Sequence, residues 1–94
     1  MYYVYVLRSK KDKNMYIGFT SDLRQRFKSH NNGLNTSTKN RRPLELIYYE
    51  AFLNEHDARD KEMFYKSGRG HEVLSKILKN YFSSVGRPSE SEGS

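Results

Sequence analysis

The sequence predicts a small α+β domain, an α/β sandwich in coarser terms, with a three-stranded, mostly antiparallel sheet flanked by helices in the order β-β-α-β-α-α. Two observations support this fold class. Three segments are rich in β-branched and aromatic residues, which fit a pleated surface, and apolar residues recur at helical spacing in the segments between and after them. A chain of 94 residues holds one modest core. We therefore expect its site at an edge of the fold rather than deep inside.

The predicted strands cover residues 1–7, 15–19 and 44–52. The first, MYYVYVL, is apolar on both alternating faces, which is typical of a central strand. The second, MYIGF, follows after a short polar turn, so the two are expected to form a hairpin. Gly18 interrupts the second strand, which indicates either a bulge or a close approach to the backbone.

Three helices are predicted, over residues 22–31, 55–67 and 71–82. Thr20 and Ser21 are expected to cap the first helix, and Asn54 is expected to cap the second. The run Gly68-Arg69-Gly70 is expected to break the chain before the last helix. Residues 83–94 are small, polar and acidic, so we expect a disordered tail behind a domain that spans residues 1–82.

Composition narrows the classes of function. The chain has 17 Lys and Arg, 11 Asp and Glu and no cysteine. The absence of cysteine excludes a disulfide scaffold, a Cys-ligated zinc site, an iron–sulfur cluster and a thiol nucleophile. No apolar run is long enough to span a bilayer or to form a secretory signal, so we expect a soluble cytoplasmic protein with no membrane partner. The net charge of +6 is compatible with a polyanionic partner but does not establish one.

Five features are candidates for chemistry: Tyr5, the run Tyr16-Ile17-Gly18, Arg26, His30 and Glu62. Each also has a structural interpretation. The tyrosines could be half-buried strand residues, the glycine a bulge, the arginine a solvated charge and the histidine a surface or capping residue. Glu62 falls among core-facing positions of its helix, where an acid is unexpected, but it could simply pair with Lys66 four residues later. None of these features is decisive alone.

Their spacing, however, resembles that of the GIY-YIG nuclease superfamily. The resemblance begins with Tyr3-Val4-Tyr5 and Tyr16-Ile17-Gly18, and Arg26 follows eight residues after that glycine. It continues through residues 58–62 (ARDKE), Lys66 and residues 68–70 (GRG), and covers about residues 2–78. The chain looks like the small, single-domain bacterial members described as excinuclease-subunit-like. The chain departs from the family pattern in three ways: the first motif reads YVY, Phe19 follows the glycine where the repair nucleases carry lysine, and the late asparagine of some relatives has no clear match.

The resemblance implies a role for each of these residues. Tyr5 and Tyr16 match the motif tyrosines, and Arg26 matches the catalytic arginine. His30 stands where relatives have a residue that assists proton transfer, and Glu62 matches the single metal-binding glutamate. The residue types suit phosphodiester hydrolysis, because a guanidinium can donate to phosphate oxygens in a planar fork. A single carboxylate is enough for Mg²⁺ or Mn²⁺ that keeps several waters.

The nucleophile is expected to be water, deprotonated by a tyrosine or through His30. A tyrosine has an ordinary pKa of about 10, so it would need nearby positive charge from Arg26 or the metal to act as a base. A covalent tyrosyl–DNA intermediate is the less favoured alternative.

The function implied is a metal-dependent DNA endonuclease, directed by DNA structure rather than sequence, in DNA repair or processing. A catalytically weak nucleic-acid-binding module of the same fold is the first alternative, and a scaffold protein without nucleic acid is the second. RNA is not excluded as a substrate, and the protein is expected to be a monomer or weak homodimer. The residues expected to contact phosphates are Lys39, Arg41, Arg42, Lys66 and Arg69.

Overall fold

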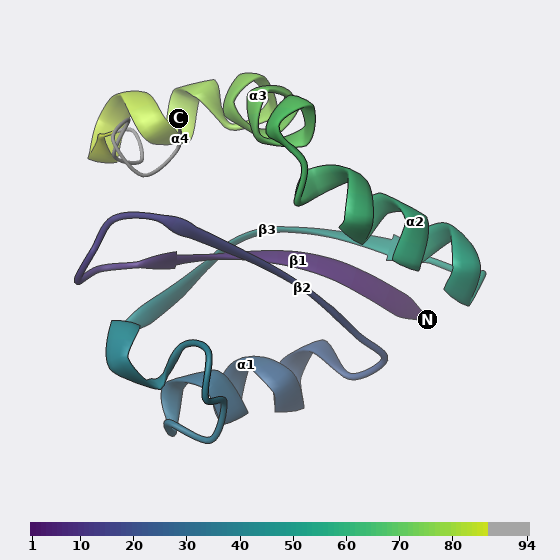
Figure 1. Ribbon diagram of the computed structural model, residues 1–94, viewed down its shortest axis with the longest axis horizontal. Helices are drawn as coiled ribbons and strands as arrows, with labels where there is room; N and C mark the ends of the chain where they lie inside the picture. The colour runs from purple at the N-terminus through teal and green to yellow at the C-terminus, as the bar shows by residue number, and fades with distance from the viewer. Residues whose placement is uncertain (87–94) are drawn as a thin grey trace.

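The computed structural model describes residues 1–86, which form an α+β fold built on one antiparallel sheet (Figure 1). Its strands are β1 (Tyr2–Ser9), β2 (Met15–Thr20) and β3 (Leu44–Phe52), in the spatial order β2-β1-β3. The prediction of a central first strand that forms a hairpin with the second is therefore confirmed. The central position also gives Tyr5 two paired neighbours, Gly18 on β2 and Tyr49 on β3.

The helices cover both faces of this sheet, so the molecule has three layers (Figure 1). They are α1 (Leu23–Asn31), α2 (Glu55–Tyr65), α3 (Gly68–Ile77) and α4 (Lys79–Val85), and a single 3₁₀ turn spans Lys39–Arg41. In Figure 1, α1 lies below the sheet, while α2, α3 and α4 lie above it. The element order is thus β-β-α-β-α-α-α, with one helix more than the sequence predicted.

Alternation along β1 divides the core in two, because successive side chains of a strand point to opposite faces. Val4 and Val6 pack with α2, α3 and α4 in the larger cluster. Tyr5 and Leu7 belong to the smaller cluster, between the sheet and α1, together with Leu44. The side chains of α1 that pack there are Leu23 and Phe27. Tyr5 therefore lies on the side of the sheet that α1 covers.

The predicted capping of α1 is wrong. Asp22 is the N-cap, and its carboxylate accepts a hydrogen bond from the backbone N–H of Gln25 at 3.1 Å. Thr20 instead ends β2, and its hydroxyl oxygen accepts from the N–H of Asp22 at 3.0 Å. Asn54 caps α2 as predicted, by accepting from the N–H groups of His56 and Asp57.

The predicted break at residues 68–70 is also wrong, because α3 begins at Gly68. The hydroxyl of Ser67 accepts a hydrogen bond from the N–H of Gly70 at 3.0 Å, so the serine caps the helix and the glycines lie within its first turn. The predicted single last helix is two helices, since the backbone at Leu78 (φ −104°, ψ 22°) departs from helical geometry.

The last described helix, α4, continues to Val85, three residues beyond the predicted end of the domain. The rest of the predicted tail, residues 87–94, lies outside the described residues, so the domain boundary at residue 82 stays a prediction. Within residues 1–86, none of the helices has the length and apolar character needed to cross a membrane.

Candidate active site

At the centre of the site, three buried polar side chains are linked by two hydrogen bonds. The hydroxyl of Tyr5, on the central strand, lies 2.8 Å from Nε2 of His30, in the last turn of α1. The other ring nitrogen of His30, Nδ1, lies 2.7 Å from the hydroxyl of Thr38. All three residues are at most 2% exposed. Buried polar groups of this kind are retained where they are hydrogen-bonded, and the two bonds fix the orientation of the imidazole ring.

Tyr16 completes an aromatic cluster around this histidine. Its ring centroid lies 5.1 Å from that of His30 and 6.5 Å from that of Tyr5. Tyr16 comes from β2, so the cluster joins both strands of the hairpin to α1. The two tyrosines and the histidine, which the sequence analysis selected as candidates, therefore lie close together in space.

Gly18 is a point of close approach rather than a bulge, since the pairing of β1 with β2 is in continuous register. A Cβ atom at this position would lie 2.3 Å from the hydroxyl oxygen of Tyr5 and 2.3 Å from the ring carbon that bears it. Only glycine leaves room for the tyrosine ring here. Tyr5 can thus adopt the conformation in which its hydroxyl reaches His30 only because residue 18 is a glycine.

Two charged residues act on this cluster from opposite sides of the sheet. Burial raises the pKa of the Tyr5 hydroxyl well above its ordinary value of 10.0, and Tyr16 raises it further. The positive charge of Arg26, from α1, opposes the shift, and the carboxylate of Glu62, from α2, adds to it. Both charges therefore lie within electrostatic range of the Tyr5 hydroxyl.

A tyrosine that acts as a base needs a lowered pKa, whereas the net effect of these influences on Tyr5 is a raised pKa. Arg26 acts in the expected direction, but burial outweighs it, so Tyr5 holds its proton more firmly than a free tyrosine. The pKa of His30 is lowered below its ordinary value of 6.5, first by burial and then by Arg26. The imidazole is therefore neutral near pH 7 and able to accept a proton.

Glu62 is the carboxylate whose charge acts on the Tyr5 hydroxyl. Its side chain is 17% exposed, and its carboxylate accepts a hydrogen bond at 2.8 Å from Nζ of Lys66, the C-cap of α2. Within residues 1–86, no group of three or more His, Cys, Asp or Glu side chains could enclose a metal. A single carboxylate nevertheless fits Mg²⁺ or Mn²⁺, because such ions commonly keep several waters and take phosphate oxygens as further ligands. Lys66 is the side chain that a cation at Oε2 would have to displace.

The residues predicted to contact phosphates do not form one cluster. The guanidinium of Arg41 makes a 2.6 Å ion pair with Asp12 and also donates to the carbonyls of Asn14 and Met15. It therefore ties the basic loop to the β1–β2 turn. Arg42 donates to the carbonyl of Lys39 at 2.8 Å. Arg69 and Lys66 are exposed near the junction of α2 and α3.

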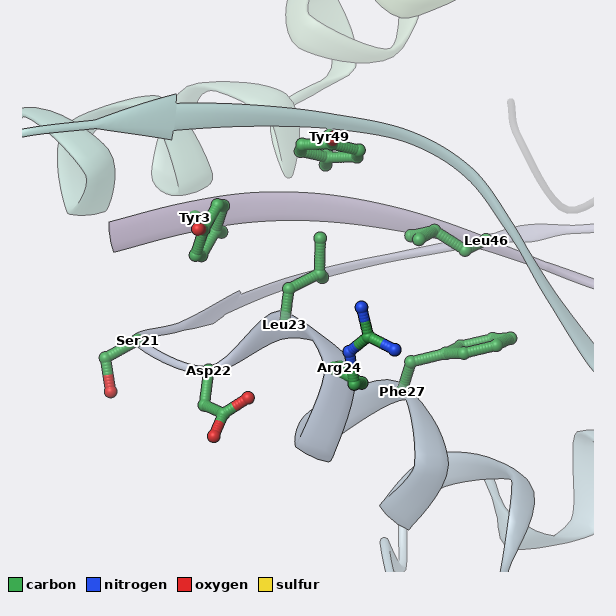
Figure 2. A pocket seen from close by; sticks show the side chains of 8 residues that line it. All are labelled: Tyr3, Ser21, Asp22, Leu23, Arg24, Phe27, Leu46 and Tyr49. Carbon is green, nitrogen blue, oxygen red and sulfur yellow. The ribbon is translucent and has the colours of Figure 1, made fainter. Parts of the chain in front are cut away.

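One hollow of the described surface lies away from these residues. Its volume is about 470 Å³, and it lies beside the start of α1 and the strands β1 and β3 (Figure 2). Figure 2 shows Tyr3, Tyr49, Phe27 and Arg24 among the side chains around it. None of the five candidate catalytic residues lines it. The candidate cluster instead includes Tyr16 of β2, an outer strand of the sheet.

Comparison with known proteins connects this geometry to a family. The sequence profile of the GIY-YIG catalytic domain matches residues 1–72. The chain belongs to the GIY-YIG family. The resemblance inferred from Tyr5, Tyr16, Gly18, Arg26 and Glu62 is thereby confirmed at the level of the family, and membership indicates a nuclease that acts on nucleic acid.

Several relatives of this GIY-YIG chain are small bacterial proteins named UPF0213. One, encoded in the ldhD 5′ region of Pediococcus acidilactici, is 44% identical over 82 residues, which cover 84% of this chain and 82% of the relative. Another, from Clostridium perfringens, is 42% identical over 78 residues, covering 82% and 83%. The solution NMR structure of a UPF0213 protein from Bacillus halodurans matches with a TM-score of 0.52 and 34% identity, covering 82% of this chain and 85% of that one. These names assign no substrate.

The sequence analysis did not identify Thr38, which is hydrogen-bonded to His30 in the buried cluster. It lies in a polar, basic segment, where a threonine is expected to be exposed. Backbone hydrogen bonds from the N–H groups of Thr38 and Lys39 to the carbonyl of Asn35 turn this segment back beneath α1. That fold of the chain, rather than any side-chain pattern, buries the threonine against His30.

Proposed function

We propose that this GIY-YIG protein is a divalent-metal-dependent DNA endonuclease that hydrolyses phosphodiester bonds in DNA repair or processing. One observation carries the proposal: Tyr5, Tyr16 and His30 form one cluster beside the bare backbone of Gly18, and the charges of Arg26 and Glu62 act on it. An imidazole, phenols, a guanidinium and a lone carboxylate are the groups that such a hydrolysis needs.

Proton transfer in this proposal runs through the buried hydrogen bond. As water attacks the phosphorus, Tyr5 takes a proton from the water and passes its own proton to Nε2 of His30. The lowered pKa keeps the imidazole neutral and able to accept that proton. The raised pKa means that Tyr5 serves as a relay rather than as a pre-formed phenolate.

In this proposal, Arg26 and the divalent cation stabilise the negative charge of the phosphate. The exposed guanidinium of Arg26 donates one hydrogen bond, to Oδ1 of Asn35 at 3.3 Å, and has further N–H groups to offer to phosphate oxygens. Glu62 would hold Mg²⁺ or Mn²⁺, which, when bound, supplies Lewis-acid stabilisation of the leaving oxygen. Contacts of this kind are made to the backbone, so we expect the structure of the DNA, rather than its sequence, to direct cleavage.

The decisive experiment compares the wild type with Glu62→Gln and Tyr5→Phe on supercoiled plasmid and on branched and single-stranded DNA with Mg²⁺ or Mn²⁺. We expect each substitution to lower the cleavage rate by roughly 10² or more, which is the usual scale for loss of a general-base pathway or a metal ligand. Glu72→Gln, at an exposed position of α3, is the matched control and should cut like the wild type. Equal nicking by wild type and Glu62→Gln would overturn the proposal. An RNA strand of the same sequence separates deoxyribonuclease from ribonuclease activity.

A further inference from the structure

Arg59, on α2, is held in place by an aromatic ring of the neighbouring strand. Its guanidinium carbon lies 4.0 Å from the centroid of the Phe19 ring on β2. Phe19 itself stacks on Tyr2, with 6.2 Å between centroids and an angle of 12° between the ring planes. The Arg59 side chain is nevertheless 53% exposed. The guanidinium is thus restrained by the ring while part of it stays open to solvent.

Arg59 lies on the same helix as Glu62, one turn before it. It precedes Glu62 by three residues and Lys66 by seven, so the three side chains follow one side of α2. Phe19 directly follows Gly18, so its ring points away from Tyr5, to the face of the sheet that α2 covers, where it packs against the larger core cluster. Arg59 and Lys66 therefore lie on either side of Glu62 along α2 and its C-cap, and the charge of Glu62 acts on the Tyr5 hydroxyl.

We propose that Arg59, positioned by Phe19, binds a phosphate of the DNA backbone next to the bond that is cut. This inference rests on the proposed function and names a binding residue for the same site. A guanidinium keeps its charge at all relevant pH values and can donate two parallel hydrogen bonds to one phosphate. Restraint by the ring reduces the side-chain entropy that is lost when the phosphate is bound.

The ion pair with Glu55 does not prevent this role. Nε of Arg59 donates to the Glu55 carboxylate at 3.0 Å, which leaves the terminal N–H groups of the guanidinium for a second partner. Both side chains are about half exposed (53% and 44%), and an exposed pair of this kind adds little stability. A phosphate can therefore share or replace the carboxylate at low cost.

The first test measures how the affinity for a branched DNA oligonucleotide depends on salt, in EDTA so that no hydrolysis occurs. Each phosphate that is neutralised contributes about 0.9 to the slope of log K against log salt. We expect Arg59→Met to lower the slope by about 1. Arg24→Met is the matched control, because it removes the same charge from an exposed residue beside the hollow of Figure 2; its slope should stay at the wild-type value. Equal loss in both variants, or in neither, would overturn the proposal.

The second test asks whether Phe19 acts through Arg59. Phe19→Leu removes the aromatic face but keeps an apolar side chain, and we expect DNA affinity to fall roughly two- to fivefold, the scale of an exposed cation–π contact. In the Arg59→Met background the same change should have no further effect. A loss of equal size in both backgrounds would show that the ring does not position the guanidinium. Thermal unfolding of each variant checks that it is folded, and the slope test stands whatever Phe19→Leu does to folding.

These measurements separate the inference from the proposed function. A lowered slope in Arg59→Met, together with no cleavage by the wild type in Mg²⁺, would support the phosphate contact and overturn the nuclease. An unchanged slope in Arg59→Met, together with cleavage that depends on Glu62, would overturn the phosphate contact and support the nuclease. Wild-type protein without salt-dependent DNA binding would overturn the inference directly.

Discussion

At the residue scale, the close approach of Tyr5 to Gly18 lets the Tyr5 hydroxyl reach the buried His30. Gly18→Ala would place a Cβ 2.3 Å from the Tyr5 hydroxyl, so the ring must move and the 2.8 Å hydrogen bond to His30 must break. We expect cleavage to fall by roughly 10², the scale of a lost proton-transfer pathway, and the fold to lose about 1–3 kcal/mol from overpacking. Rates of plasmid nicking and the free energy of unfolding in urea measure the two effects.

The control for this variant is Gly68→Ala. A Cβ at Gly68 has no neighbouring atom within 4 Å, so the substitution tests a glycine that is not pressed against another residue. Nicking should be unchanged. If Gly18→Ala cuts as fast as Gly68→Ala, the close approach has no catalytic importance.

The buried histidine also predicts how stability depends on pH. The pKa of His30 is lower in the folded protein than its ordinary value of 6.5, so the unfolded chain takes up a proton first as the pH falls. The free energy of unfolding should therefore decrease below about pH 6.5. Asp12 and Glu50, whose pKa values are lowered from ordinary values of 3.8 and 4.5, lose their contributions only in more acidic solution.

Urea unfolding at pH 8 and pH 5 checks this prediction on the wild type and His30→Asn. The gap in stability between the two proteins should narrow at pH 5, because only the wild type carries the histidine that must stay neutral in the fold. Parallel pH curves for the two proteins would contradict it.

The sequence could predict the catalytic candidates because the family fixes their spacing, but it could not predict the contacts between them. Tyr5 and His30 are 25 residues apart, and their hydrogen bond exists only after α1 folds over the sheet. Thr38 carries no pattern at all, since its burial follows from the turn of a polar segment. The shift in the pKa of Tyr5 was likewise beyond reach, because burial dominates it and burial is a property of the fold.

At the element scale, the junction of α2 with α3 depends on Gly70. A Cβ there would lie 1.9 Å from the carbonyl oxygen of Phe64 and 2.6 Å from Cα of Tyr65, so the backbone of one helix would have to move. We expect Gly70→Ala to cost 1–3 kcal/mol or more. Gly68→Ala, two residues earlier in the same helix, should instead be neutral or stabilise the fold by up to about 1 kcal/mol. Thermal unfolding of the two variants side by side measures the contrast, and equal unfolding temperatures would contradict it.

The elements themselves show where sequence patterns succeed. All three strands were predicted to within two residues, because alternation and β-branched residues report directly on a pleated, buried surface. The errors fall at helix ends. Ser67 caps α3 and draws the glycines into its first turn, whereas glycine runs usually indicate a break. The break between α3 and α4 at Leu78 could not be predicted from the sequence, because the helical spacing of apolar residues continues through residues 73–82.

At the scale of the whole molecule, the two outer strands of the sheet have different surroundings. The β2 side carries the tyrosine–histidine cluster and Glu62, while the hollow of about 470 Å³ lies on the β3 side. The molecule measures 33 × 29 × 21 Å, so its longest dimension is close to one turn of B-DNA, about 34 Å. If it binds a DNA duplex as proposed, a protein of this size contacts few phosphates, so we expect the loss of one contact to be a measurable fraction of its salt dependence.

Removal of divalent ions should separate catalysis from folding. Within residues 1–86, no cluster of three or more metal-ligating side chains exists to tie segments of the fold together, and the larger core cluster is apolar except for its tyrosines. We therefore expect EDTA to abolish cleavage and to leave the unfolding temperature of the free protein unchanged, because an ion held by Glu62, water and phosphate contributes little before DNA is bound. Returning Mg²⁺ or Mn²⁺ in excess should restore cleavage in the wild type but not in Glu62→Gln. A fall of several degrees in the unfolding temperature on chelation would instead show that the ion is structural, since a metal that stabilises the native state raises that temperature by mass action.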